Sequence, residues 1–368
     1  MLKPINFLLK GWIKFSRVAN QDHGFTLIEL LIGLVMAVLV MIPLFALMFN
    51  IMTTDQNEQA KTNSEQELQT AMDFITRDLQ QAVYIYDYQG VTSNYSATPS
   101  SSGIKNSLPT VTSGVPILVF WKRELISSVI PTDAGTNDDA FAYSLVAYYL
   151  IKDSNANWSN TARIARWQIK DGVRSINNNT GVTCSGSYDT TVKFVATTNC
   201  PDAGFVPFNL DRATGDVTQK MNQWRSPDTT NYPTMTASYP ATPQVLIDYI
   251  DQTIPPTNPT TNSPSITVST ASCPADANTI KTDSSGNTTS TSITPISSAT
   301  MTSFYVCVSN YLDTTNPGQV ISTVQIFIRG NALARIQQSN IDYTNKTQQT
   351  YFPNVSAIVQ ARGFLYSR

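Results

Sequence analysis

Hydrophobic residues gather in one long run near the start of the chain. Phe25–Met52 contains one charged residue, Glu29, and one proline, Pro43. A helix that crosses a bilayer needs about 20 mainly apolar residues, so this run is long enough to do so. No second run of this kind follows in the sequence. The remainder is therefore expected on one side of the membrane.

The pattern changes after Met52, but it stays compatible with a helix. Thr53–Gln66 is polar and contains neither glycine nor proline. Beyond it, apolar residues recur at spacings of three and four, which places them on one helix face. These residues are Leu68, Ala71, Met72, Ile75, Leu79, Ala82, Val83 and Tyr86. The pattern predicts one helix from Phe25 to about Tyr86, roughly 90 Å long.

The helix faces outside this stripe are expected to be polar. Asp73, Arg77, Asp78 and Gln81 fall outside the apolar stripe in this interpretation. The first half of the helix is apolar all round and the second half is apolar on one side. A coiled-coil partner is disfavoured for the second half, because the pattern lasts too few heptads.

After Gly90 the chain alternates between polar loops and short segments typical of strands. Val91–Gly114, rich in Ser, Thr, Asn and Pro, is expected to be a loop. Pro255–Thr302 has only scattered apolar residues, which predicts surface decoration or flexibility. The expected strands are Pro116–Lys122, Phe141–Ile151, Arg163–Lys170, Thr191–Ala196, Gln244–Ile250, Ser303–Ser309 and Val320–Arg329.

The last of these segments gives the clearest strand pattern. Val324, Ile326 and Ile328 alternate with Gln325, Phe327 and Arg329, the two-residue period of a sheet. The fold class expected is therefore α+β. A long N-terminal helix, transmembrane in its first half, packs on an antiparallel β-sheet head with long polar loops.

Composition and charge narrow the function classes. Only 14% of the 368 residues are charged, against a globular average of roughly 25%. The net charge is −2, and no basic stripe is present to meet phosphates. A nucleic-acid partner is therefore not expected.

Two ordinary explanations of the first 52 residues fall short. A secretory signal peptide has a shorter apolar core followed by a small-residue cleavage site. A simple signal anchor fits the length, and the basic residues before the run keep the N-terminus cytoplasmic. A simple anchor does not explain Glu29, because a carboxylate in the apolar layer costs roughly 2.5–3.5 kcal/mol on insertion scales. The basic residues are Lys3, Lys10, Lys14 and Arg17.

A short motif at the start of the apolar run accounts for all of these features. It reads Gly24-Phe25-Thr26-Leu27-Ile28-Glu29-Leu30-Leu31. It resembles the cleavage and methylation motif of type IV prepilins and type II secretion pseudopilins. That pattern has a small residue before the cut, an aromatic residue after it and Glu at the fifth mature position. The resemblance implies cleavage after Gly24 by a prepilin peptidase and N-methylation of Phe25.

The resemblance also implies an organisation and a location. The expected parts are a leader over 1–24, a transmembrane and filament-core helix over 25–52, an amphipathic continuation over 53–88 and an exported head over 89–368. The expected partners are a major pilin, other minor pilins, an inner-membrane assembly platform and the membrane itself. The chain is expected in the inner membrane with its head in the periplasm, and then on the cell surface.

The motif has a physical explanation. Leader removal leaves a free amine at Phe25, and the Glu29 carboxylate of a staggered neighbour can pair with it. This pairing offsets the cost of a buried charge and sets the axial register. Gly33 allows close helix approach, although one glycine is a weak signal. Pro43 marks either a kink or locally melted stretch, or a proline tolerated in an anchor helix.

The head is larger than that of a typical major pilin, which favours a minor subunit. Several segments of the chain resemble pseudopilins of the cyanobacterial hormogonium polysaccharide secretion machinery. They are Arg77–Asp87, Phe120–Arg123, Arg329–Arg335 and Tyr351–Pro353. This resemblance implies a minor pilin that supports polysaccharide export and gliding. The alternatives are a type II secretion pseudopilin or general minor pilin and, in another class, a single-pass surface protein that binds glycans.

Four cysteines follow the leader, all in the expected exported head. An even number outside the cytoplasm predicts two disulfides. Three pairings are possible, and the shortest loops favour Cys184–Cys200 and Cys273–Cys307.

No enzyme motif is found, and no cofactor or metal is expected. The single histidine, His23, lies in the leader, which removes Ser-His and Cys-His catalysis and most zinc sites. Asp138 and Asp139 are adjacent, but two solvated loop acids are favoured over a calcium site that needs about six to eight oxygens. Four strand aromatics are expected in the core in preference to a glycan platform. They are Trp121, Tyr143, Tyr148 and Tyr149.

Overall fold

The computed structural model describes residues 26–132, 135–176, 180–211, 215–228, 235, 239, 242–266, 280–282, 288–294, 301–313, 319–363 and 365. Gly24, Phe25, His23 and Cys273 lie outside these residues. The chain divides into two compact units, Met1–Gln56 and Asn57–Arg368.

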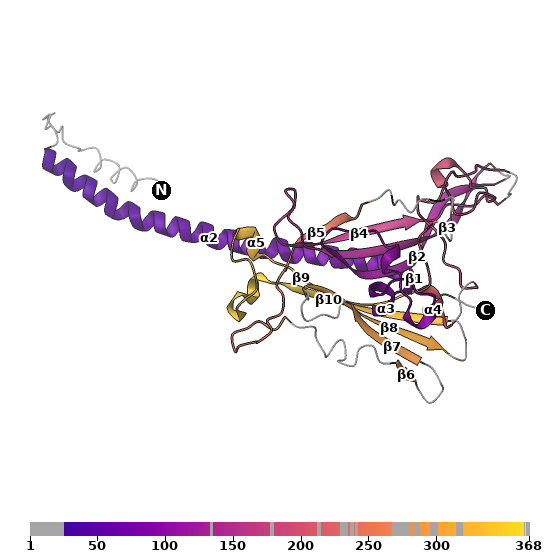
Figure 1. Ribbon diagram of the computed structural model, residues 1–368. Helices are drawn as coiled ribbons and strands as arrows, with labels where there is room; N and C mark the ends of the chain where they lie inside the picture. Colours follow the sequence, from indigo (N-terminus) through magenta and orange to yellow (C-terminus); the bar gives the residue numbers. More distant parts are fainter. Residues whose placement is uncertain are drawn as a thin grey trace, which may run out of the picture. The chain divides into compact units, whose positions relative to one another are not determined.

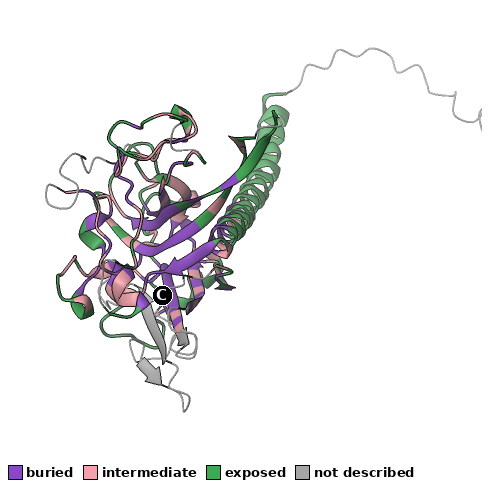
Figure 2. Cartoon of the chain, turned by 90° about the vertical axis from the view of Figure 1, so that its right-hand side faces the viewer, coloured by how far each residue is buried: buried purple, intermediate pink, exposed green. Residues whose placement is uncertain are grey.

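The described part of the first unit is helical. Helix α2 spans Leu27–Gln80 and continues through Pro43 (Figure 1). From Leu27 to Met52 every residue of this helix is exposed (Figure 2). Among the described residues α2 alone is long and apolar enough to cross a membrane. The long N-terminal helix predicted from the sequence is confirmed.

The second unit contains the rest of α2, and here the helix is buried on one side. Its buried apolar residues follow the predicted stripe from Leu68 to Leu79. They pack against apolar residues of two β-sheets, one on either side of the helix, in a single core. In Figure 1 the strands β2 to β5 and the strands β8 to β10 lie on opposite sides of this part of α2.

The helix ends earlier than the sequence pattern indicated. It stops at Gln80, and Ala82–Ile85 forms strand β1, which pairs with β2. The prediction of helix to Tyr86, and of an amphipathic helix up to residue 88, is wrong here. Ala82 to Tyr86 is a run of five apolar residues, all buried. A strand covered on both faces buries such a run completely, whereas a one-sided helix cannot.

The first sheet has five antiparallel strands in the order β1-β2-β3-β4-β5. The remaining four strands are β2 (Gly114–Pro131), β3 (Asn137–Ile151), β4 (Ala162–Lys170) and β5 (Gln244–Ile250). Alternate residues face opposite sides of this sheet. Phe120, Val146 and Ile164 join the core around α2, while Val119, Leu145 and Ala165 join a second core on the other side.

The second sheet also has five antiparallel strands, in the order β10-β9-β8-β7-β6. They are β6 (Ile280–Thr282), β7 (Thr288–Thr294), β8 (Phe304–Asp313), β9 (Gln319–Arg329) and β10 (Asn354–Gln360). Along β9, Val324, Ile326 and Ile328 are buried and the residues between them are half-buried, which confirms the predicted alternation. A bridge between Ile250 and Gly330 joins the two sheets at one end.

Two other strand predictions need correction. Thr191–Ala196 forms no strand; only Phe194 makes isolated bridges, to Arg174 and Val182. Pro255–Thr302 is more than loop decoration, because it contains β6 and β7. β7 reads TTSTSIT, so its pairing with β8 comes from backbone hydrogen bonds and not from an apolar pattern.

Loops and short helices form a third layer over the outer face of the first sheet. Trp121, in β2, contacts Phe205, Phe208 and Trp224 edge to face. The expected loop Val91–Gly114 is largely irregular. Within the described residues the short helices are α3 (Tyr88–Thr92), α4 (Val217–Met221) and α5 (Leu333–Ile336), with 3₁₀ turns at Pro99–Ser101, Lys105–Ser107, Thr197–Asn199 and Lys346–Tyr351.

A disulfide fixes this third layer. Cys184 and Cys200 are bonded, with their Cα atoms 5.7 Å apart, which is the first pairing favoured from the sequence. Cys307 is disulfide-bonded as well. Its expected partner Cys273 lies outside the described residues, so that pairing stays a prediction.

Protein taken from the cell surface is expected to contain no thiol that reacts with an alkylating agent. Replacing Cys184 and Cys200 together by serine should lower the free energy of unfolding by about 3 kcal/mol, because the open chain gains entropy when unfolded. Mass spectrometry after alkylation measures the first effect, and denaturant titration measures the second. Reduced and denatured protein is the control, and should accept alkylation at all four cysteines. Four reactive thiols in the native surface protein would contradict the prediction.

Candidate functional site

The described helix begins with a capped turn that contains Glu29. The Glu29 backbone N–H donates to the Thr26 hydroxyl at 3.3 Å, and the Leu30 N–H donates to the Thr26 carbonyl at 3.2 Å. A hydroxyl that accepts a hydrogen bond from a free N–H group of the first turn, as Thr26 does from Glu29, is typical of a helix N-cap. The acidic side chain of Glu29 sits in the first turn, where the helix dipole favours negative charge.

Glu29 has no partner within the described part of the chain. Its side chain is exposed, and no described basic group forms an ion pair with it. The expected processing residues Gly24 and Phe25 lie just before the described residues. Glu29 therefore remains available to a group supplied from outside this part of the chain.

The helix surface around Glu29 is apolar on every side. Its large hydrophobic residues are exposed, from 84% at Leu27 to 45% at Met52. Isolated soluble proteins rarely expose a contiguous apolar surface of this size. The segment needs lipid, other apolar helices or both around it, because contact between so many apolar side chains and water is unfavourable.

The second part of α2 is held in the head by polar contacts at two places. The first is Arg335, in α5. Its Nε donates to the Ser64 hydroxyl at 3.0 Å, and its guanidinium pairs with Glu67. The same guanidinium lies 4.1 Å from the centre of the Tyr249 ring. We call Arg335, Ser64 and Glu67 the entry clamp.

Arg335 belongs to the segment Arg329–Arg335, and the whole segment positions it. Arg329 pairs with the fully buried Asp251 at 2.7 Å. Gly330 lies so near the helix that a Cβ atom would come within 2.8 Å of Leu68. Asn331 accepts a hydrogen bond from the Ala334 N–H at 3.0 Å and so supports α5. The segment therefore brings the sheet edge against α2 and aims Arg335 at it.

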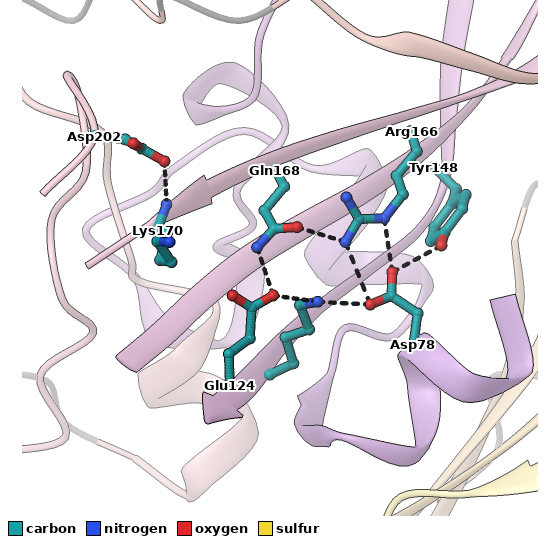
Figure 3. A network of polar contacts seen from close by, with 8 residues as sticks. Asp78, Glu124, Tyr148, Arg166, Gln168, Lys170 and Asp202 are labelled. Atoms are coloured by element: carbon teal, nitrogen blue, oxygen red, sulfur yellow. Dashed lines mark hydrogen bonds and ion pairs between the residues drawn. The ribbon is translucent and has the colours of Figure 1, made fainter. Parts of the chain in front are cut away.

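The second place is the end of the helix, where Asp78 is buried in a charge cluster (Figure 3). Lys122 donates to Asp78 Oδ1 at 2.7 Å and Arg166 Nε donates to Oδ2 at 2.8 Å. Tyr148 OH also donates to Oδ2, at 2.8 Å. Side chains from three strands, β2, β3 and β4, thus bind this one carboxylate of the helix.

A second acid balances the cluster. Glu124 pairs with Lys122 and accepts a hydrogen bond from Gln168 Nε2 at 2.7 Å. Two carboxylates therefore face two cations, Lys122 and Arg166. Such balance is needed because an unpaired charge in this position would carry the full cost of leaving water. We call Asp78, Lys122, Glu124, Tyr148 and Arg166 the end clamp.

The charges shift the protonation equilibria of the cluster. Burial alone raises the pKa of Asp78, but the Arg166 and Lys122 cations outweigh burial and hold that pKa below its ordinary value of 3.8. The same holds for Glu124. Burial raises its pKa, but the Lys122 cation outweighs burial and holds the pKa below its ordinary value of 4.5. Burial raises the pKa of Tyr148 well above 10.0, so its hydroxyl stays protonated and donates.

The end clamp corrects the sequence interpretation. Asp78 was expected on a polar outer face, yet it is 7% exposed and points into the head. A signal was present, because Asp78 follows Ile75 by three residues and so lies at the edge of the apolar stripe. Arg166 and Lys122 gave a second signal, as cations directly beside the buried apolar residues Trp167 and Trp121 of their strands.

The other candidate residues lie elsewhere. Trp121, Tyr148 and Tyr149 are buried, as expected for core residues, whereas Tyr143 is 37% exposed. Asp138 and Asp139 are exposed at the start of β3. Among the described residues no group of three or more His, Cys, Asp or Glu side chains is placed to hold a metal ion.

Asp78→Asn is expected to lower the free energy of unfolding of the head by about 3–5 kcal/mol at neutral pH, because it leaves Lys122 and Arg166 without their shared anion. Asp78 has a lowered pKa in the folded state, so its stabilisation is complete above 3.8 and is lost as the pH falls below that value. The difference in free energy of unfolding between wild type and variant should therefore disappear in strong acid. Denaturant titration followed by tryptophan fluorescence measures it.

The matched control is Asp73→Asn, which changes an exposed acid of the same helix. It should alter the free energy of unfolding by no more than about 0.5 kcal/mol. If the difference in free energy of unfolding between wild type and Asp78→Asn stays constant from neutral pH to well below 3.8, ionised Asp78 does not hold the helix end.

Comparisons with known proteins concern the N-terminal segment. Residues 19–45 match the family described as the prokaryotic N-terminal methylation motif. No curated protein and no solved structure matches the chain. The match covers Gly24, Phe25 and Glu29 and continues into the exposed apolar part of α2. The chain carries a prepilin-type methylation motif, and this motif supports its assignment to the type IV pilins and pseudopilins.

Proposed function

We propose that this protein is a minor pilin or pseudopilin subunit of a type IV pilus-like filament machine, and that the machine supports polysaccharide secretion and gliding motility. The observation that carries the proposal is one helix with two different surfaces. Its start bears the methylation motif and an exposed apolar surface, and its end is buried between two sheets. This role is structural and requires no catalytic group.

The exposed apolar segment suits two successive environments. In the membrane it spans the bilayer as a single helix, and in a filament the same surface packs against the helices of neighbouring subunits. Processing by a prepilin peptidase frees the Phe25 amine. Glu29, which has no described partner, then pairs with the Phe25 amine of a neighbour.

The polysaccharide role rests on the resemblance of four segments of the chain to hormogonium pseudopilins. Three of them contain parts of the two clamps. Arg77–Asp87 contains Asp78, Phe120–Arg123 contains Lys122 and Arg329–Arg335 contains Arg335. The resemblance thus covers the residues that fix α2 in the head, which supports a shared subunit architecture.

The first outcome to measure is the mature N-terminus. Native protein should begin at N-methylated Phe25, because the Gly24-Phe25 pair and the basic leader match the prepilin pattern. Intact mass and N-terminal sequencing of protein from its own cells check this. A single-pass surface protein of another class would keep its leader, so a native N-terminus at Met1 would contradict the proposal.

The second outcome concerns assembly. Glu29→Ala and Glu29→Gln should leave leader cleavage intact and reduce the amount of subunit in sheared surface filaments relative to the membrane pool. Insertion should become easier, because the variant no longer places a carboxylate in the apolar layer at a cost of roughly 2.5–3.5 kcal/mol. Assembly should suffer, because the Phe25 amine of the neighbour is left without a counter-charge.

Glu65→Ala is the matched control, since it removes an exposed carboxylate further along the same helix. Glu65→Ala should enter filaments as the wild type does. Equal incorporation of Glu29→Gln and wild type would show that the Glu29 charge does not direct assembly.

A further inference from the structure

A cavity of about 810 Å³ opens on the outer side of the first sheet, where the β2–β3 hairpin extends beyond the core. This volume lies within the range of small-molecule sites, roughly 300–1,000 Å³. One cavity residue, Arg123, lies between the end-clamp residues Lys122 and Glu124 along β2, and its side chain points to the opposite face of the strand. The cavity lining includes exposed or half-buried side chains that the assembly role does not use, among them Arg123, Phe141 and Asp171.

One wall of the cavity is aromatic. Phe141 is 55% exposed, and Tyr143 follows on the same face of β3. Phe208 contacts Tyr143 edge to face, with ring centres 5.3 Å apart, and closes the floor against Trp121. Large rings exposed side by side at a cavity offer flat apolar faces to a ligand.

The polar groups beside these rings have unused hydrogen-bonding capacity. The Arg123 guanidinium lies 3.7 Å from the centre of the Phe141 ring, and no described residue forms a hydrogen bond or ion pair with it. Asp171 Oδ1 accepts from Tyr188 OH at 3.0 Å and from the Gly172 N–H at 2.7 Å. Its Oδ2 has no partner among the described residues. The cavity thus presents a free donor and a free acceptor.

These contacts are fixed in place by the fold. The Asp171 N–H donates to the Tyr143 carbonyl at 2.8 Å, which sets the acid beside the aromatic wall. Arg174 donates to Tyr188 OH at 3.0 Å, and Tyr188 in turn donates to Asp171. This chain orients the carboxylate before any ligand arrives.

The charge of the cavity selects the class of ligand. Arg123 and Arg174 are balanced by Asp139 and Asp171, so a phosphate or sulfate group would meet two carboxylates. A purely apolar ligand would desolvate these charged groups without pairing them. Sugar hydroxyl groups both donate and accept, and the C–H face of a pyranose ring suits an aromatic face.

We infer that this cavity binds a pyranose unit of a polysaccharide, with the ring against Phe141 and Tyr143 and its hydroxyls on Arg123 and Asp171. The inference deepens the proposed function by giving the exported polymer a contact on the subunit.

The test uses full-length processed protein in detergent micelles and hexasaccharides of glucose, galactose, mannose and galacturonic acid. At least one should bind saturably in isothermal titration calorimetry. Phe141→Ala and Arg123→Ala should each weaken that binding about tenfold, the loss of one stacking or cation contact. Trp158→Ala is the control, because it removes another exposed aromatic residue, 42% exposed, outside the cavity.

Three results would overturn the inference. These are an absence of saturable binding to all four sugars at millimolar concentration, an equal loss in Trp158→Ala, and displacement of the sugar by inorganic phosphate. Phe141→Ala should still enter filaments normally, because its side chain does not contact α2. Failure of sugar binding with normal cleavage and assembly would therefore overturn this inference alone.

Discussion

Burial of the Asp78 carboxylate is the interaction on which the arrangement of the head depends. The apolar stripe of α2 supplies most of the attraction between the helix and the two sheets, but such attraction has no direction. A helix with residues repeating every three or four positions can slide one turn in an apolar groove and still bury a similar area. Asp78 removes this freedom, because only one position brings its carboxylate to Lys122, Tyr148 and Arg166 together.

A slip of one turn shows the size of the constraint. It would place Phe74 or Ala82 opposite Lys122 and Arg166, and would leave Arg166 without an anion and Lys122 with Glu124 alone. Breaking a buried pair in this way costs about 3–5 kcal/mol, a large share of the stability of most domains. At the entry clamp the same slip would replace Ser64 by Ala60 or Leu68 opposite Arg335. Both clamps therefore specify one register, and they do so from opposite ends of the buried stripe.

Residue patterns predicted the parts of this structure that repeat with a regular period. The stripe from Leu68 to Leu79 and the alternation along β9 follow directly from 3.6- and two-residue periods. β10 had such a signal as well, since Val355, Ala357 and Val359 alternate, and it was overlooked. β7 had no such alternating apolar pattern, because this polar strand is held by backbone hydrogen bonds to β8. The switch from helix to β1 depends on both faces of Ala82–Ile85 being covered, and only tertiary structure provides that cover.

The same distinction between local sequence pattern and tertiary environment applies to the functional residues. Glu29 was proposed from local order and spacing alone, because a carboxylate in an apolar run is conspicuous in any fold, and its role in assembly stays a prediction. Asp78 was misplaced, since its environment is built from three strands that lie 44 to 88 residues away along the chain. The two acids, near the two ends of α2, have a comparable role in selecting a packing register. Each lies at a helix position where apolar packing permits several registers, and each selects one register through a specific cation: Asp78 within its own head and Glu29, in the proposed filament, on the neighbouring subunit.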